Sequence, residues 1–237
     1  MTRRLPASTV PARRPEVTLK AAVTLDGRSA ARSGESKWIT GEPARREVHR
    51  MRARADAVLV GVGTVLADDP ELTVRAVRGR SPLRVVLDSA LRTPLASKLV
   101  QSARRHRTLL LHAPAASVAR QRKLAATGVE LATVRPARNG SGLDLTSALR
   151  VLADRGVLGL LVEGGARVHG ALLDAGLVDR VAIFVAPCLL GDAQALPLAA
   201  GRKPRSLAAA FRIRKPEVLR LGDDVLVRGE LTAPGAA

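Results

Sequence analysis

The stretch LGLLVEGGARVHGALL, residues 158–173, decides how the rest of the chain is interpreted. It begins with the apolar run 158–162, continues with Glu163 and the pair Gly164-Gly165, and ends in apolar residues at helical spacing. This pattern predicts a strand, a glycine turn and a helix start. Glycine lets a backbone pass close to a ligand, and the first amides of a helix favour a phosphate. A tight connection without a ligand would have the same sequence, so the motif alone leaves both interpretations open.

The composition limits what kind of protein this is. The chain has 237 residues and is 46% hydrophobic, which is enough for one large domain or two small ones. Aromatic residues make up only 1%, so the core has to be built from Val, Leu and Ala. Modules that bind nucleic acid by stacking bases on aromatic side chains are disfavoured, and we expect no specific nucleic-acid partner.

The net charge of +18 points to anionic partners, although a basic surface typical of an Arg- and Ala-rich proteome explains it equally well. The single cysteine, Cys188, permits no intramolecular disulfide, which suits a reducing compartment. No apolar run approaches the roughly 20 residues that cross a membrane. Residues 1–15 lack the apolar centre of a secretory signal. We therefore expect a cytoplasmic protein without a membrane partner.

The hydrophobic pattern alternates strands with helices. This alternation predicts an α/β fold in three layers, with a mostly parallel sheet and an antiparallel C-terminal hairpin. We expect a disordered arm or linker remnant over 1–15, a single domain over 16–232 and a tail over 233–237. Strands are expected over 17–23, 57–62, 83–88, 108–112, 129–134, 158–162 and 181–185, helices over 43–54, 117–126, 145–155 and from 166, a long loop over 24–36, and the hairpin over 217–221 and 225–231.

Several catalytic classes lack the residues that would carry them. The sequence has no G-x-S-x-G elbow, no G-x-x-x-x-G-K-[ST] loop and no paired cysteines of a zinc deaminase, and its four histidines show no metal-ligand spacing. We therefore expect no metal. What remains is a set of polar residues after the expected strands. Ligands of open α/β sheets bind at the carboxyl ends of the strands, so these residues form the candidate site.

Six strings then carry a family resemblance. They are LKAAVTLDGRSA, SGESKWITG, RREVHRMRARADAVLVGVGTVLADDPELTVR, PLRVVLDS, VEGGARVHGALLDAGLVD and APCLLG, spread from about residue 17 to 191. Together they resemble the reductase domain of bacterial riboflavin biosynthesis, the C-terminal half of a bifunctional pyrimidine deaminase/reductase. The resemblance implies a dihydrofolate-reductase-like fold, NADPH as cofactor and a homodimer. It implies reduction of 5-amino-6-(5-phosphoribosylamino)uracil to the ribitylamino phosphate. The deaminase half has no counterpart here, so we expect a stand-alone reductase.

Residue roles follow from the matched positions. We expect Lys20, Asp26 and Asp68 near the reacting centre as catalytic groups, with Lys20 and Asp26 as our own proposal of polar groups that aid ring opening. Arg52 and Arg75 would bind the substrate phosphate, and Glu163 would accept the N–H groups of the pyrimidine. The substrate contacts implied by the resemblance are Ser36, Arg52, Leu72, Arg75 and Glu163. The implied cofactor contacts are Ala22, Trp38, Thr64, Asp68, Ser89, Gly164, Gly165, Ala166, Arg167, Val168, His169, Gly170 and Ala171. Arg92 is our own addition, as a cation for the 2′-phosphate of NADPH.

Two other functions stay open at this stage. One is a different reductase on the same fold, acting on a dihydropterin or a related pyrimidine. The other, from a different class, is a non-catalytic polyanion- or RNA-binding protein, suggested by the charge of +18. Such a protein would bind random RNA with a steep salt dependence and would oxidise no NADPH. The order of deamination and reduction is also open, so the 2,5-diaminopyrimidinone form is a second possible substrate.

Overall fold

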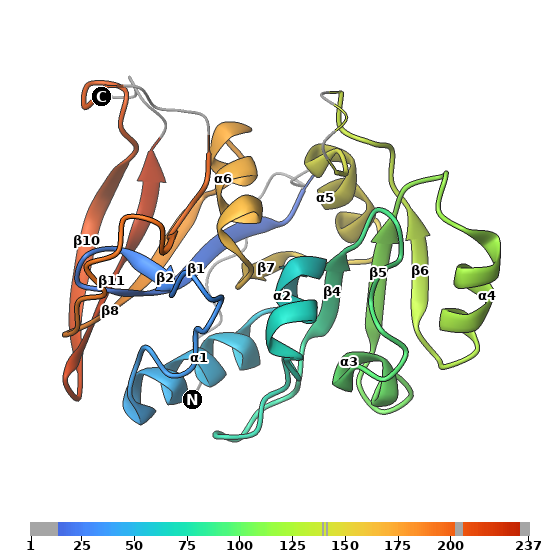
Figure 1. Cartoon of the computed structure of the whole chain (residues 1–237), viewed down its shortest axis with the longest axis horizontal. Coiled ribbons are helices and arrows are strands. Elements are labelled where there is room, and N and C mark those ends of the chain that lie inside the picture. Colours follow the sequence, from blue (N-terminus) through green and yellow to red (C-terminus); the bar gives the residue numbers. More distant parts are fainter. Residues whose placement is uncertain (1–13, 139, 141, 202–205, 233–237) are drawn as a thin grey trace.

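A computed structural model describes residues 14–138, 140, 142–201 and 206–232 (Figure 1). Nine strands form one sheet in the order β10-β11-β8-β1-β7-β3-β4-β5-β6. The strands are β1 (Glu16–Thr24), β3 (Ala57–Gly61), β4 (Leu83–Leu87), β5 (Thr108–His112), β6 (Glu130–Thr133), β7 (Gly159–Val162), β8 (Arg180–Ala186), β10 (Arg212–Leu221) and β11 (Asp224–Thr232). The helices are α1 (Glu42–Arg54), α2 (Val62–Asp68), α3 (Lys98–Gln101), α4 (Val118–Ala125), α5 (Leu145–Ala153) and α6 (Ala166–Asp174).

The seven strands from β8 to β6 are parallel, and β11 pairs antiparallel with β8 and with β10. This confirms the expected fold class, including the antiparallel hairpin at the C-terminal end of the described chain. The hairpin strands are longer than the apolar segments from which we predicted them. Their pairing extends to Arg212 and Thr232. The prediction fell short because β10 is an exposed edge strand with many polar and charged side chains, so its outer part contains no apolar run.

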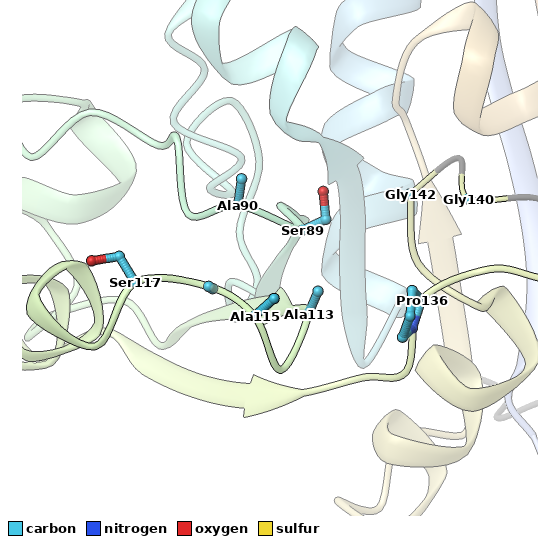
Figure 2. A pocket seen from close by; sticks show the side chains of 9 residues that line it. Ser89, Ala90, Ala113, Ala115, Ser117, Pro136, Gly140 and Gly142 are labelled. Atoms are coloured by element: carbon cyan, nitrogen blue, oxygen red, sulfur yellow. The ribbon is translucent and has the colours of Figure 1, made fainter.

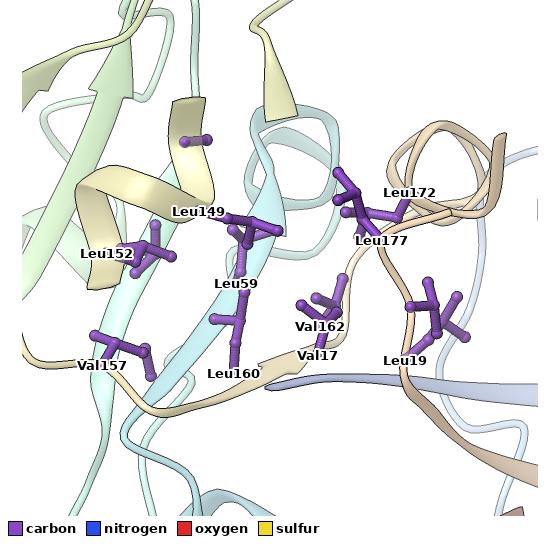
Figure 3. Packing of buried hydrophobic residues seen from close by; sticks show 14 of the residues in the cluster. Val17, Leu19, Leu59, Leu149, Leu152, Val157, Leu160, Val162, Leu172 and Leu177 are labelled. Atoms are coloured by element: carbon purple, nitrogen blue, oxygen red, sulfur yellow. The ribbon is translucent and has the colours of Figure 1, made fainter. Parts of the chain in front are cut away.

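Helices cover both faces of the sheet. In Figure 1, α5 and α6 lie above it, and α1 and α3 lie below. On the α5 and α6 side, a core of Val, Leu and Ala runs from β1 to β5, and Figure 3 shows part of it around Leu59, Leu149 and Leu172. On the other face, one cluster packs α2, α3 and α4 against β3, β4 and β5, and a smaller one packs α1 against Phe184 of β8. This nearly aromatic-free core confirms the expected use of aliphatic residues.

The expected loop over 24–36 is wrong in one part. It contains the short strand β2 (Arg28–Ala30), which pairs antiparallel with β9 (Leu196–Pro197) in a sheet of two strands. Helices α2 and α3, of seven and four residues, were also not predicted. Segments this short give no measurable hydrophobic period, so tertiary contacts rather than the sequence pattern define them.

The start of the described chain is fixed to the sheet. Arg14, which the sequence placed in the arm, donates from its guanidinium to both carboxylate oxygens of Asp179 at 2.6 and 2.8 Å. Asp179 also accepts the backbone N–H of Val17 at 2.8 Å. These contacts fix the amino end of β1 beside β8. The rest of the expected arm, 1–13, and the expected tail, 233–237, lie outside the described residues.

Candidate active site

Three charged side chains meet where β1 and β7 lie side by side. Glu163 directly follows β7, and its backbone N–H donates to Leu59 of β3 at 2.9 Å. Arg52, in the last turn of α1, donates from Nε and Nη2 to the two carboxylate oxygens of Glu163 at 2.6 and 2.8 Å. Lys20 of β1 places its Nζ 3.9 Å from the same carboxylate. The fold brings these three predicted site residues together, although Lys20 and Glu163 are 143 positions apart in the sequence.

Burial makes this cluster electrostatically strong. The side chains of Glu163, Arg52 and Lys20 are only 6, 12 and 15% exposed. Burial alone would raise the pKa of Glu163, but the charge and hydrogen bonds of Arg52, with the charge of Lys20, bring that pKa down to about 2. Burial lowers the pKa of Lys20, although the carboxylate of Glu163 opposes this shift. The cluster thus combines a firmly ionised acceptor with a lysine that gives up its proton more readily than usual.

Arg75 and Leu72 lie in a segment that borders the cluster. Arg52 also donates from Nη1 to the backbone carbonyl of Thr73 at 3.1 Å, which ties the segment to α1. The guanidinium of Arg75 is half-exposed and lies 3.5 Å from Glu71. Leu72 is 3% exposed, with its side chain in the second core cluster. Only the backbone of Leu72 can therefore face a substrate, whereas Arg75 offers its side chain.

The double glycine brings two turns into close contact. A Cβ on Gly164 would lie 2.5 Å from the Cα of Val60 and 3.0 Å from the backbone N of Gly61, so only glycine fits. Gly165 has a φ of 73°, and a Cβ there would lie 3.1 Å from Oγ1 of Thr64. The turn after β7 therefore packs on the turn from β3 to α2. This close approach places Thr64 of α2 beside the N-terminus of α6.

The N-terminus of α6 suits an anion. Gly165 is its N-cap and contributes no side-chain hydrogen bond, so the first amides have no side-chain acceptor. Further along α6, two of the predicted cofactor contacts already pack against other parts of the chain. His169 is buried with its Nδ1 3.0 Å from the carbonyl of Leu198, and Gly170 lies against the backbone of Ala200. Of the stretch 164–171, the glycine turn and the first helical residues are therefore best placed for a ligand, and the other assignments stay predictions.

The loop before α1 contributes Ser36 and Trp38. Ser36 donates from Oγ to the carboxylate of Asp68, at the end of α2, at 2.9 Å. Trp38 is 68% exposed and stacks on the guanidinium of Arg45, whose Cζ lies 4.6 Å from the ring centroid. This exposed indole is held in place by its neighbour and presents a flat apolar surface. The role of Trp38 as a cofactor contact stays a prediction.

Ser89 lies in a separate pocket of about 290 Å³ at the carboxyl ends of β4 and β5. Figure 2 shows its small side chains, with Ser89 and Ala90 on one side and Ala113, Ala115 and Ser117 on the other. The loop that carries Ser89 is fixed by the buried Asp88, which accepts the backbone N–H groups of Arg92 and Thr93 at 2.8 and 2.7 Å. The side chain of Arg92 is exposed and does not line the pocket.

Asp26 lies apart from the charged cluster, whereas Ala22 lies beside it. Asp26 accepts the hydroxyl of Thr24 at 2.6 Å and the backbone N–H groups of Leu190 and Gly191 at 3.1 and 2.9 Å. These hydrogen bonds lower the pKa of Asp26 to about 2. Its carboxylate holds two loops together in this state, so its predicted catalytic role has no contact in support. Ala22 faces the same side of β1 as Lys20 and packs in the cluster around Phe184.

Sequence reasoning missed His49 of α1. This histidine is 7% exposed, and its Nδ1 accepts the backbone N–H of Arg75 at 3.3 Å. The signal was available, because His49 precedes Arg52 by three residues and therefore shares its side of the helix. Among the described residues no group of three or more His, Cys, Asp or Glu could hold a metal ion. No helix in that part of the chain is long and apolar enough to cross a membrane.

Comparisons with known proteins agree with this geometry. Residues 15–227 match the profile of the family described as RibD C-terminal domain. The riboflavin biosynthesis protein RibD of Actinobacillus pleuropneumoniae is 37% identical over 94% of this chain and 58% of its own length. The 2,5-diamino-6-ribosylamino-4(3H)-pyrimidinone 5′-phosphate reductase of Methanothermobacter thermautotrophicus is 38% identical over 94% of this chain and its full length. The chain thus spans a little over half of the first relative and all of the second.

Solved structures give the same answer for the fold. The structure of Acinetobacter baumannii RibD has a TM-score of 0.79 and 33% identity, covering 93% of this chain and 59% of that protein. This likeness confirms the dihydrofolate-reductase-like fold that the sequence strings implied. Because the profile covers most of the residues and one relative aligns over its whole length, the chain belongs to the RibD C-terminal domain family.

Proposed function

We propose that this chain reduces 5-amino-6-(5-phosphoribosylamino)uracil to 5-amino-6-(5-phosphoribitylamino)uracil with NADPH, as a step of riboflavin biosynthesis. The observation that carries the proposal is the buried cluster of Lys20, Arg52 and Glu163 beside the double-glycine turn. An ionised acceptor, a lysine with a lowered pKa and a helix start that suits an anion lie together after the central strands. Each of the three has a task in the reduction of a phosphorylated pyrimidine as we propose it.

The family implies a nicotinamide cofactor, and the residues present fit one. The N-terminus of α6 suits its pyrophosphate, since Gly164 and Gly165 leave room for close approach. The pocket at Ser89 is large enough for part of an adenosine and offers a hydroxyl. When bound, the cofactor supplies a hydride. The choice of NADPH over NADH, and the contacts of Ala22, Trp38, Thr64, Asp68 and Arg167, are part of the proposal.

The chain's own groups have defined tasks in this reaction. Opening of the ribose ring moves a proton from the exocyclic nitrogen to the ring oxygen and leaves an imine. Reduction then adds a hydride at the anomeric carbon and a proton at the nitrogen. Lys20 is the group we assign to these proton transfers, because burial lowers its pKa and so eases release of the proton. Glu163 orients the pyrimidine by accepting its N–H groups, and Arg75 binds the phosphate.

A second substrate is favoured by one specific observation. The relative that this chain matches over its full length is named as the reductase of the 2,5-diamino pyrimidinone phosphate. That substrate carries an amino group where the uracil carries an oxygen. The acceptor oxygens of Glu163 can take N–H groups from either ring, so the cluster accommodates both compounds in principle.

The deciding experiment measures NADPH oxidation with each pyrimidine, generated enzymatically in situ. We expect turnover with at least one of them, and loss of most of it in Lys20→Met. Absence of turnover with both would overturn the proposal and would direct attention to dihydropterins. The relative catalytic efficiencies identify which pyrimidine the chain prefers.

We further propose that residues 16–232 act as one domain, that the protein is a cytoplasmic homodimer, and that it needs no metal. The strand β10 supports the dimer, because it is an edge strand with Val218 and Leu219 exposed by 66 and 37%. An uncovered edge with apolar side chains favours pairing with a second copy. Sedimentation of the purified chain distinguishes a dimer from a monomer.

A further inference from the structure

The segment 69–75 carries Arg75, yet it belongs to no helix or strand. It leaves α2 through Asp69, which has a φ of 41°, and continues through Leu72, with a φ of 54°. Both values lie in the left-handed region that side chains disfavour. A buried irregular segment still has to satisfy its backbone N–H and carbonyl groups. The side chains that do so therefore determine where this segment lies.

Strand β4 and its preceding residues hold one side of the segment. Arg84 donates from Nη1 to the carbonyl of Glu71 at 3.1 Å, and Ser81 accepts the backbone N–H of Val74 at 3.0 Å. Arg84 is fully buried and also bonds carbonyls around α3, so it is part of the core. These contacts fix the middle of the segment against the sheet.

Helix α1 holds the other side with two residues one turn apart. Arg52 donates to the carbonyl of Thr73 at 3.1 Å, and His49 accepts the backbone N–H of Arg75 at 3.3 Å. His49 is 7% exposed, so its ring has little freedom to turn away. Of these tethers, only that of His49 acts directly on the backbone of Arg75, the residue with the half-exposed guanidinium.

We propose that His49 is a positioning residue for substrate binding, whose unprotonated Nδ1 holds the Arg75 amide and thereby sets where the Arg75 guanidinium meets the substrate phosphate. The inference rests on the proposed function, because it assigns the phosphate to Arg75. His49 itself touches no substrate in this scheme. It affects substrate binding, and therefore the Michaelis constant, through the backbone of Arg75. The hydride step is unaltered.

The charges around His49 make the hydrogen bond sensitive to pH. Arg52 of α1 and Arg75 of the segment are cations beside it, and Glu163 after β7 is the nearby anion. Glu71 pairs with Arg75, and Lys20 lies across the Glu163 carboxylate. Burial, followed by the two arginines, lowers the pKa of His49 against the opposing effects of Glu163 and of a hydrogen bond to the Thr73 backbone, so the net shift favours the neutral ring. A protonated ring has no lone pair on Nδ1 and adds a third cation, so acidification breaks the tether.

Two substitutions separate the acceptor from the bulk of the ring. His49→Asn places Oδ1 at the position of Nδ1, where it accepts the same N–H but does not titrate. His49→Leu keeps the volume and removes the acceptor. His106→Asn is the matched control, since His106 precedes β5, which two strands, β3 and β4, separate from β7.

We expect His49→Leu to raise the KM for the pyrimidine by about tenfold, because the charge-assisted contact of Arg75 with the phosphate is then misplaced. The kcat and the KM for NADPH should be nearly unchanged. His49→Asn and His106→Asn should stay close to wild type. In wild type the pyrimidine KM should rise on acidification through the His49 titration, and in His49→Asn this rise should be absent. Amide exchange of peptides covering 72–76 should accelerate in His49→Leu only.

Several outcomes would overturn the inference. They are an unchanged KM in His49→Leu, an Asn variant as impaired as the Leu variant, or an Asn variant with the wild-type pH profile. If His49→Leu does not fold, the Asn variant's pH profile still decides. If wild type reduces no pyrimidine, the proposed function fails, and equal amide exchange in wild type and His49→Leu would separately refute the tether.

Discussion

Arg52 and Glu163 form a two-pronged ion pair inside the candidate site, with Nε to Oε1 at 2.6 Å and Nη2 to Oε2 at 2.8 Å. The guanidinium edge of Arg52 that could bind a phosphate is therefore already engaged by Glu163, whereas each carboxylate oxygen of Glu163 keeps a second lone pair for a pyrimidine N–H. The guanidinium also bonds the carbonyl of Thr73 at 3.1 Å. Our expectation that Arg52 and Arg75 are equivalent phosphate anchors needs revision on this geometry. Arg52 organises the site, and Arg75, with its side chain 51% exposed, is the arginine available to a phosphate.

The first prediction compares the two arginines. Arg75→Ala should weaken pyrimidine binding by about ten- to a hundredfold, because a lost charge-assisted hydrogen bond costs roughly 1.5–3 kcal/mol. Its melting temperature should be unchanged, since its ion pair with Glu71 is exposed. Arg52→Ala should also lower the free energy of unfolding by about 3 kcal/mol, because it removes both hydrogen bonds to the buried carboxylate of Glu163 and leaves only Lys20 at 3.9 Å as its charged partner. Calorimetry with each ligand and thermal unfolding provide the measurements. Equal stability of the two variants would contradict the assigned difference.

The second prediction concerns stability in acid. The pKa of Glu163 falls from 4.5 to about 2 in the folded protein, so its ionised form favours folding. This contribution is complete above the unfolded value of 4.5 and is lost as the pH falls toward 2. The difference corresponds to about 3 kcal/mol. The free energy of unfolding should be measured with denaturant between about pH 6 and about pH 2, a range that spans both pKa values of Glu163. It should fall in wild type as the pH is lowered, and much less in Glu163→Gln. Parallel pH curves for the two proteins would show that Glu163 does not carry the effect.

The sequence predicted the architecture well because the central strands are short, almost uninterrupted apolar runs and most of the helices between them have a clear period. The strand, glycine turn and helix of residues 158–173 appear as β7, the turn and α6. The failures occur where contacts distant in the sequence determine the structure. The strand β2 exists because it pairs with β9, about 167 residues away in the chain. No local pattern carries such information.

The site was predictable as a list of residues and not as a set of contacts. Lys20 and Glu163 were named, and the structure joins them with Arg52, but the sequence could not show that the arginine would bond the carboxylate. The role of His49 was missed for a similar reason. A side chain that holds a backbone amide leaves no compositional trace, because the group it recognises is present in almost every residue.

The third prediction tests the contact between the two glycine turns. Gly164→Ala should destabilise the protein by roughly 1–3 kcal/mol, because the new Cβ would lie 2.5 Å from the Cα of Val60 and the backbone would have to move. Gly63 of α2 is the matched control, since a Cβ there meets nothing within 4 Å. Gly63→Ala should leave stability level or raise it by up to about 1 kcal/mol, as alanine favours a helix. Chemical denaturation measures both. A tolerated alanine at 164 would show that the turns do not pack as closely as described.

The last prediction concerns cofactor choice. Ser89 lines the pocket after β4, and its hydroxyl is the polar side chain on that wall, whereas the side chain of Arg92 is exposed outside the pocket. If the adenosine ribose of NADPH lies here, Ser89→Ala should reduce the preference for NADPH over NADH by about ten- to a hundredfold, the effect of one hydrogen bond to a charged group. Arg92→Ala should reduce it by less than about tenfold, because solvent screens an exposed cation. Arg105→Ala serves as the control, because this exposed arginine precedes β5 and so lies at the amino ends of the strands, opposite to the pocket. The measurement is catalytic efficiency with each cofactor at fixed pyrimidine concentration. If Ser89→Ala keeps the wild-type preference, the 2′-phosphate does not bind in this pocket. A larger effect of Arg92→Ala than of Ser89→Ala would show that the exposed cation of Arg92 contacts the 2′-phosphate instead.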